Sequence, residues 1–160
     1  MAMRIWVDAD ACPVAIKQML FRAAERRRVH VTLVANQFMR VPKSPYIRTL
    51  QVESGFDVAD TRIVESVVPD DLVVTADIPL ADRVVERGAV ALNPRGMLYT
   101  RENIGEHLAR RNFMDELRSA GTVTGGPATL DRSDLNAFAN ALDRYLTRHL
   151  VRATPEDGGH

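Results

Sequence analysis

The stretch RIWVDADACP at residues 4–13 decides how the rest of the chain is interpreted. Its first four residues, Arg4 to Val7, form a short apolar run that predicts a buried strand, and two aspartates follow at once. Pro13 then suits the first turn of a helix, where its missing N–H has no intrahelical partner to lose. A buried strand that leads through acidic residues into a helix is typical of a parallel α/β sheet.

Helix and strand patterns alternate after this stretch. Apolar residues recur at helical spacing in residues 14–28, 56–67 and 78–87. Apolar runs typical of strands cover residues 29–35, 49–53, 71–76 and 89–92. Gly88 is suited to end the helix before the last of these runs. Because repeated strand–helix–strand units produce parallel strands with helices on the faces, the sequence predicts an α/β fold with about five parallel strands.

The pattern changes towards the C-terminus. Two amphipathic helices are predicted there, over residues 102–119 and 133–150. They cover an edge of the sheet, form a contact in a homodimer, or hold a substrate strand, and the sequence leaves this choice open. Residues 1–150 are predicted to form a single α/β domain whose helical extension begins at about residue 100, with a disordered polar tail over 151–160.

Composition indicates an ordinary globular protein. Of the 160 residues 46% are hydrophobic and 26% are charged, and the 21 basic side chains balance the 21 acidic ones. Binding of a polyanion would therefore depend on local patches rather than on net charge. The chain has one cysteine, no signal-peptide pattern and no apolar run of about 18 residues. These features predict a cytoplasmic protein without a membrane span.

Short oxygen-bearing side chains follow four of the predicted strands. Asp8 and Asp10 follow the first strand, Asn36 the second, Asp77 the fourth and Asn93 the fifth. In a doubly wound sheet the carboxyl ends of parallel strands meet at one edge, where ligands bind. Carboxylates that lie close together repel one another unless they share a cation, and Mg²⁺ or Mn²⁺ prefers oxygen ligands. The sequence therefore predicts a Mg²⁺ or Mn²⁺ site at this edge.

Several of these residues also have a simpler structural explanation. Asp10 and Asp77 could each cap the helix that follows, since aspartate favours turns and N-caps. Asp57 and Asp60, near the start of another helix, could add a metal ligand or could merely suit the positive end of the helix dipole. Cys12 lies near a helix start but is more consistent with a small core residue than with a nucleophile.

The chain contains a set of short motifs that are specific in combination. They are WVDADACP at 6–13, VANQ at 34–37, GFDVADTRIVE at 55–65, TADIPLA at 75–81, LNPRG at 92–96, GP at 126–127 and RSDLNAFANALD at 132–143. Together they resemble the YaiI/YqxD family of uncharacterised bacterial proteins, over nearly the whole chain to about Leu150. That family is similar to PIN and NYN-type nucleases, so the resemblance implies a PIN-like sheet and an acidic site that binds Mg²⁺ or Mn²⁺ for phosphodiester hydrolysis.

The resemblance also implies roles for individual acids. Matched by motif, Asp8 is the acid at the end of the first strand, with Asp10 beside it. Asp57 or Asp60 supplies the acid in the middle of the chain, and Asp77 supplies the acid after the Thr-x-Asp strand end. The family carries no established activity, so the resemblance says more about the fold than about the reaction.

The first functional hypothesis is a metal-dependent phosphodiesterase, or nuclease, that acts on RNA. Asn36 would position water or substrate, while Asn93 and Arg95 would bind the substrate, with Arg95 clamping a phosphate oxygen. The loop after the second strand would hold a single-stranded backbone with basic side chains and stack a base on an aromatic ring. The residues concerned are Arg40, Lys43, Arg48, Phe38 and Tyr46. The alternative for this loop is a solvated surface with both aromatic rings in the core.

Two other functions stay open. A non-catalytic regulatory module would recognise RNA or a nucleotide through the same edge of the sheet. A small-molecule phosphatase is suggested by the Asp-x-Asp pattern of Asp8 and Asp10, with the first as nucleophile and the second as acid or base. The sequence lacks a well-placed lysine after the second strand and an Asp-Asp pair after a later one, which disfavours the phosphatase.

Overall fold

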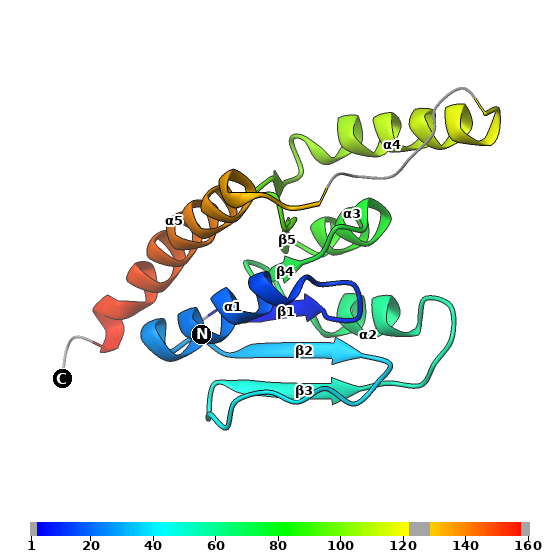
Figure 1. The fold of residues 1–160 in the computed structure, drawn as a ribbon. Coiled ribbons are helices and arrows are strands. Elements are labelled where there is room, and N and C mark those ends of the chain that lie inside the picture. The colour runs from blue at the N-terminus through cyan, green and yellow to red at the C-terminus, as the bar shows by residue number, and fades with distance from the viewer. Residues whose placement is uncertain (1–2, 122–128, 158–160) are drawn as a thin grey trace.

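The computed structural model describes residues 3–121 and 129–157. The elements along the chain are β1 (Ile5–Asp8), α1 (Val14–Arg27), β2 (Val31–Ala35), β3 (Ile47–Gln51), α2 (Val58–Ser66), β4 (Leu72–Val74), α3 (Ile78–Glu86), β5 (Val90–Leu92), β6 (Leu98–Tyr99), α4 (Ile104–Ser119) and α5 (Arg132–Asp157). Within the described residues, six strands form one sheet in the order β3-β2-β1-β4-β5-β6 (Figure 1). The strands β1 to β5 are parallel, and β6 pairs antiparallel with β5.

The predicted fold class is confirmed, but some boundaries differ. The α/β fold, its mostly parallel sheet and its flanking helices are as the sequence predicts. The prediction of about five strands misses β6, because two residues are too few to show a strand period. The edge strand β3 begins at Ile47, two residues earlier than predicted, because its mostly exposed side chains carry little hydrophobic alternation.

The sequence predicts a disordered tail from residue 151, and the structure differs over residues 151–157. The helix α5 continues to Asp157. Once a helix has formed, each added residue costs little free energy, and neither glycine nor proline occurs between Ser133 and Thr154. The rest of the predicted tail, residues 158–160, lies outside the described residues, as do the GP motif at 126–127 and most of the Gly-rich break around it.

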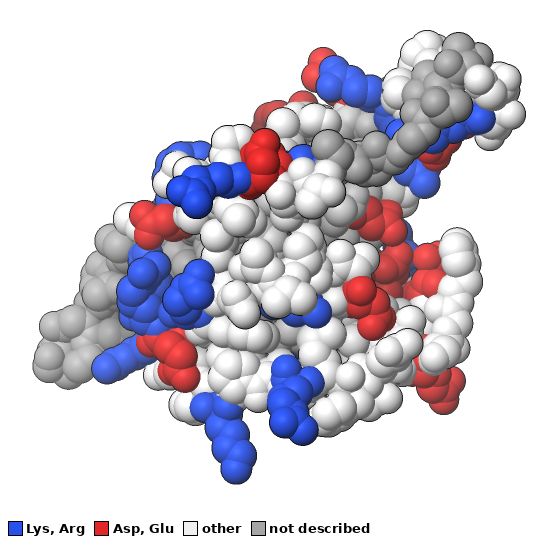
Figure 2. All heavy atoms as spheres, viewed as in Figure 1, with Lys and Arg blue, Asp and Glu red and all other residues white. Residues whose placement is uncertain are grey.

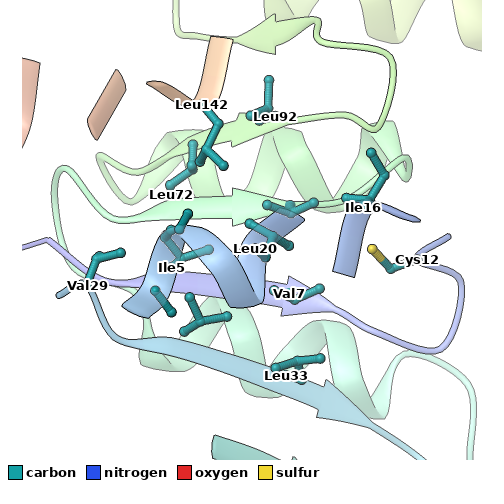
Figure 3. Packing of buried hydrophobic residues seen from close by; sticks show 14 of the residues in the cluster. Ile5, Val7, Cys12, Ile16, Leu20, Val29, Leu33, Leu72, Leu92 and Leu142 are labelled. Atoms are coloured by element: carbon teal, nitrogen blue, oxygen red, sulfur yellow. The ribbon is translucent and has the colours of Figure 1, made fainter. Parts of the chain in front are cut away.

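Helices cover both faces of the sheet and produce three layers (Figure 1). On one face Ile5 and Val7 of β1 pack in a core with Leu20 of α1 and Leu142 of α5 (Figure 3). On the other face Trp6 belongs to a second core, which α2, α3 and the start of α4 cover. Neighbouring residues of β1 thus point to opposite faces, as the strand period requires, and burial on both faces explains its continuous apolar run.

The parallel strands β2 and β3 are joined without a helix. Their connection, residues 36–46, runs along the α1 face, where Met39, Val41 and Tyr46 pack against the core. Phe38 on the same connection points outwards and is 78% exposed. Of the two aromatic residues that the sequence placed either in a binding loop or in the core, Tyr46 joins the core and Phe38 does not.

Both C-terminal helices contact the sheet layers. Helix α4 packs on α3, and α5 lies against α1 and β5. Gly96, in the turn between β5 and β6, has φ of +92°, and a Cβ there would lie 2.7 Å from the backbone of Ala137 in α5. A residue without a side chain is therefore needed for this close approach.

Homodimer formation stays a prediction. In the described part of the chain no helix combines the length and apolarity that crossing a membrane requires.

Candidate functional site

The sheet grows in two directions from β1. The chain places β2 and β3 on one side of β1 and then crosses over to place β4, β5 and β6 on the other. At such a switch point the connections leave in opposite directions, and the crevice between the strand ends is the usual ligand site. Asp8 ends β1, and Thr75 and Asp77 follow β4 directly. Asp8 and Asp77 therefore lie at this switch point of the sheet.

A chain of hydrogen bonds links Asp8 to Asp77 at the switch point. The buried hydroxyl of Thr75 donates to Oδ2 of Asp8 at 2.9 Å and accepts from the backbone N–H of Asp77 at 3.0 Å. Oδ1 of Asp77 accepts from the N–H of Leu80 at 3.2 Å and caps α3. The capping prediction for Asp77 is confirmed, and the same geometry holds Asp77 close to Asp8.

Asp10 does not cap the helix that follows it. Helix α1 has Pro13 at its N-cap position and no side-chain capping bond. Oδ2 of Asp10 accepts instead from the backbone N–H of Asn36 at 2.8 Å, which ties the end of β1 to the end of β2. Oδ1 of Asn36 is buried and has no hydrogen-bond partner among the described residues. Burying such an oxygen costs free energy unless a ligand or water supplies the missing partner.

Helix α2 brings two further acids to this edge. Asp57 precedes the helix in the left-handed conformation, with φ of 64°, and its side chain makes no capping bond. Burial, followed by the charges of Asp77, Asp8 and Asp57, raises the pKa of Asp60 to about 6. A role limited to the helix dipole would not couple Asp60 to acids on other elements. Of the two candidates, Asp60 is the one whose pKa is raised by the charges of Asp8 and Asp77, and which of the two joins a metal site stays a prediction.

Electrostatic repulsion also reaches Asp8. Burial raises the pKa of Asp8, the Thr75 hydrogen bond lowers it, and the charges of Asp77 and Asp10 raise it further. Acidic side chains gather in Figure 2 at the right-hand edge, to which the arrowheads of β1 to β3 point in Figure 1. We call the group that meets here the strand-end cluster. Its members are Asp8, Asp10, Asp57, Asp60 and Asp77.

The donors of the strand-end cluster suit a hard cation, but they are not arranged around one point. The cluster and Asn36 offer oxygen atoms alone, which are the ligands that Mg²⁺ and Mn²⁺ prefer. In the described ranges, no group of three or more His, Cys, Asp or Glu side chains is placed so that it could hold a metal ion. A cation would therefore have to draw the carboxylates together by side-chain rotation.

Asn93 and Arg95 are engaged within the protein. Oδ1 of Asn93 accepts from the N–H groups of Arg95 and Met97, and Nδ2 of Asn93 donates to the Tyr99 hydroxyl. Nη1 of Arg95 pairs with Asp134 of α5 at 2.7 Å. These contacts shape the turn between β5 and β6 and hold α5 against it. They account for both residues without a substrate, so the substrate-binding role stays a prediction.

The remaining candidates lie outside the strand-end cluster, and Lys43 and Arg48 lie towards the start of β3, at the opposite end of that strand. Arg40 and Lys43 are exposed on the 36–46 connection, where their contact with a substrate stays a prediction. Arg48 lies on β3, and its Nε donates to Thr32 of β2. Cys12 is buried, and burial raises the pKa of its thiol to about 12. A thiol with such a pKa is not ionised at neutral pH, so the prediction of a core cysteine is confirmed.

Two residues at this edge are not predicted as site residues by the sequence. Thr75 belongs to the TADIPLA motif, but its link between Asp8 and Asp77 depends on the pairing of β1 with β4. The spacing of apolar residues places Phe56 in a helix over 56–67. The structure begins α2 at Val58 and leaves Phe56 95% exposed in the preceding loop, so that part of the helix prediction is wrong.

Comparison with known proteins identifies the family. The model of the family described as uncharacterized BCR, YaiI/YqxD family matches residues 6–148. The chain belongs to this family. UPF0178 proteins of Dechloromonas aromatica (strain RCB) and Shewanella amazonensis are 63% and 62% identical to it over 146 residues, which cover 91% of this chain and 97% and 98% of theirs. The UPF0178 protein of Syntrophotalea carbinolica is 59% identical over 148 residues, which cover 92% of this chain and 100% of that protein. No solved structure matches this YaiI/YqxD-family chain.

Proposed function

We propose that the protein is a metal-dependent phosphodiesterase that cleaves RNA, with Mg²⁺ or Mn²⁺ held by the strand-end cluster. The observation that carries the proposal is the chain of hydrogen bonds through Thr75 that holds Asp77 next to Asp8 at the switch point of the sheet, where the charges of both acids raise the pKa of Asp60. Acids that perturb one another in this way, in a crevice where ligands bind, are candidates for a functional site. Because all donors are oxygen atoms, the chemistry of the site favours a hard cation.

Each residue would have a distinct part in this site. Asp8, Asp60 and Asp77 would hold the cation, with Asp10 and the unpartnered amide oxygen of Asn36 beside them. Thr75 occupies Oδ2 of Asp8 by hydrogen bonding and so orients that carboxylate. A bound divalent ion lowers the pKa of water and stabilises negative charge on phosphoryl oxygens. Without the ion, the raised pKa of Asp60 means that its carboxyl group takes up a proton at about pH 6 rather than near pH 4.

Cleavage of a labelled single-stranded RNA in the presence of Mn²⁺ tests this proposal. We expect the wild type to cut the RNA and Asp8→Asn to cut it at least about 100-fold more slowly, since metal ligation supplies several kcal/mol of transition-state stabilisation. Asp143→Asn is the matched control, because Asp143 lies on α5 with its side chain 64% exposed. It should cut as fast as the wild type. Intact RNA after incubation with folded wild-type protein and Mn²⁺ would overturn the proposal.

One observation favours a second candidate, a non-catalytic module that binds RNA or a nucleotide. In the described part of the chain no three potential ligands are already placed for a metal ion. A module of this kind would bind RNA equally well in Mn²⁺ and in EDTA, and it would leave the RNA intact. Measuring affinity and cleavage on the same RNA under both conditions separates the two candidates.

A further inference from the structure

A hollow of about 530 Å³ adjoins the strand-end cluster on the side of β3. The end of β3, the loop before α2 and the outer side of α2 form its walls. Asp57 lies in one wall and also raises the pKa of Asp60, so the hollow and the strand-end cluster share a border. The volume falls within the range of pockets that bind small molecules, roughly 300 to 1,000 Å³.

Phe56 stands at this hollow with 95% of its surface exposed, more than any other large hydrophobic residue of the described chain. A phenyl ring left in water forgoes the free energy of burial, so its position needs an explanation. The loop that carries it lies at the right-hand edge in Figure 1, where acidic side chains gather in Figure 2. A flat aromatic ring next to a candidate phosphate site is suited to stack on a base of a single-stranded nucleic acid.

The polar lining of the hollow restricts which group fits beside Phe56. Glu53, Asp57 and Glu65 contribute carboxylates, and Arg62 is the one basic residue among the described residues that line it. Carboxylates at neutral pH accept hydrogen bonds and cannot donate them. They repel a phosphate, but they complement amino groups on the edge of a base, such as N4 of cytosine. Uracil has no amino group, and its single N3–H donor lies between two carbonyl oxygens that the carboxylates repel, so uracil is disfavoured.

We propose that this hollow is a base-binding pocket. A base that carries an amino group stacks on Phe56, and the carboxylate of Glu53 or Glu65 accepts its amino hydrogens. The phosphate attached to that nucleotide then lies towards the strand-end cluster, across the border that Asp57 forms. The inference rests on the proposed function, because it assigns the substrate contact that adjoins the same site. It adds a preference for cytosine and adenine over uracil.

Equilibrium binding without cleavage tests the pocket. The probes are fluorescently labelled oligocytidine and oligouridine RNAs of about 12 nucleotides, titrated with the full chain in Ca²⁺ at fixed salt. We expect the wild type to bind oligocytidine at least about 5-fold more tightly than oligouridine. Phe56→Ala should weaken oligocytidine binding by about 10-fold, within the range measured for single stacking rings, and Phe56→Tyr should retain it.

Two control variants make the test specific. Phe113→Ala removes another exposed ring, 58% exposed on α4 and outside the hollow, and should bind as the wild type does. Glu53→Gln combined with Glu65→Gln should reduce the preference for oligocytidine, because an amide can also donate to the uracil carbonyls. Equal affinity of the wild type and Phe56→Ala, or an equal loss in Phe113→Ala, would overturn the pocket.

The pocket and the phosphodiesterase can fail separately. If Phe56 determines RNA affinity but the wild type never cleaves RNA in Mn²⁺, the pocket stands and the phosphodiesterase does not. If Phe56→Ala cleaves RNA with an unchanged KM, the phosphodiesterase stands and the pocket is wrong. Because Phe56 is exposed, its truncation should leave the fold intact, which the fluorescence of Trp6, the single tryptophan, reports.

Discussion

Two sets of carboxylates lie at opposite ends of the same pair of strands, β1 and β4. At the amino-terminal edge, Asp71 is fully buried and accepts from Trp6 Nε1, from the N–H of Val68, and from both the backbone and the guanidinium of Arg4. These bonds measure 3.0 to 3.3 Å. At the carboxyl-terminal edge, Asp8 accepts from the Thr75 hydroxyl and faces other acids. The same residue type thus has opposite surroundings.

The comparison shows that burial alone does not distinguish a structural carboxylate from a candidate functional one. The distinction is whether hydrogen-bond donors replace the water that the carboxylate has lost, which we call compensation. Asp71 has lost more water than Asp8, but donors from three residues, Arg4, Trp6 and Val68, replace that water. The strand-end cluster is less buried and is compensated poorly, so its members repel one another. Carboxylates whose repulsion is not offset lower the free energy of unfolding. Such carboxylates are therefore candidates for a functional site. The following measurements test this contrast, from the largest expected effect to the smallest.

Removing the compensated carboxylate should have the largest effect. We expect Asp71→Ala to lower the free energy of unfolding by about 3 to 5 kcal/mol, because the buried donors that bond to the carboxylate would then have no acceptor. Urea titration followed by far-UV circular dichroism measures the change without relying on Trp6, which contacts Asp71. A loss below about 1 kcal/mol would contradict the proposed difference between Asp71 and the strand-end cluster, because Asp71 would then contribute no more to stability than a surface acid.

A cation bound by the strand-end cluster should stabilise the folded protein. We expect Mn²⁺ at about 100 times its dissociation constant to raise the free energy of unfolding by about 2.7 kcal/mol, because the ion binds the folded state alone. Thermal melts with Mn²⁺ and with EDTA measure this effect as a rise in Tm. Asp8→Asn should lose the rise, while Asp143→Asn should keep it. An identical rise in Asp8→Asn would place the ion elsewhere.

Neutralising one member of the strand-end cluster should stabilise the protein in the absence of metal. The pKa of Asp60 is about 6 in the folded state and 3.8 ordinarily, so the folded state binds more protons between these values. The cost of ionising Asp60 is therefore absent below pH 3.8, grows as the pH rises to about 6, and is complete above that. After allowance for solvent screening, Asp60→Asn should gain about 1 kcal/mol at pH 8.

The matching measurement is a series of denaturant titrations in EDTA across this pH range. The gain in Asp60→Asn should shrink steadily as the pH falls towards 4. Lower stability of Asp60→Asn than of the wild type at pH 8 would mean that Asp60 is compensated in the folded state, as Asp71 is.

A surface carboxylate provides the lower limit of the scale. Asp143 pairs with Arg27 at 3.0 Å, but its side chain is 64% exposed. Because water screens such a pair, Asp143→Asn should change the free energy of unfolding by less than about 1 kcal/mol. The same urea titration measures it. A larger loss would show that α5 depends on this pair for its attachment to α1.

Local patterns were sufficient for much of the fold and for the location of the site. The apolar run before Asp8 and the run before Asp77 identified two buried strands, and alternation with helices made them parallel. In a parallel sheet, ligands bind at the carboxyl ends of the strands, so the direction of the chain shows which end of each strand lies at that edge. By the same rule Asp71, which directly precedes β4, lies at the opposite end of that strand from the strand-end cluster.

Contacts between distant segments determined what local patterns could not. The raised pKa of Asp60 depends on how α2 lies over β1 and β2, and the Thr75 bond to Asp8 joins residues 67 positions apart. The pairing of Arg95 with Asp134 likewise needed the docking of α5. The physical reason is that hydrophobic periodicity reports which side of an element is buried. Hydrogen bonds and charge repulsion act between atoms a few ångströms apart, and their partners are chosen when the elements come together.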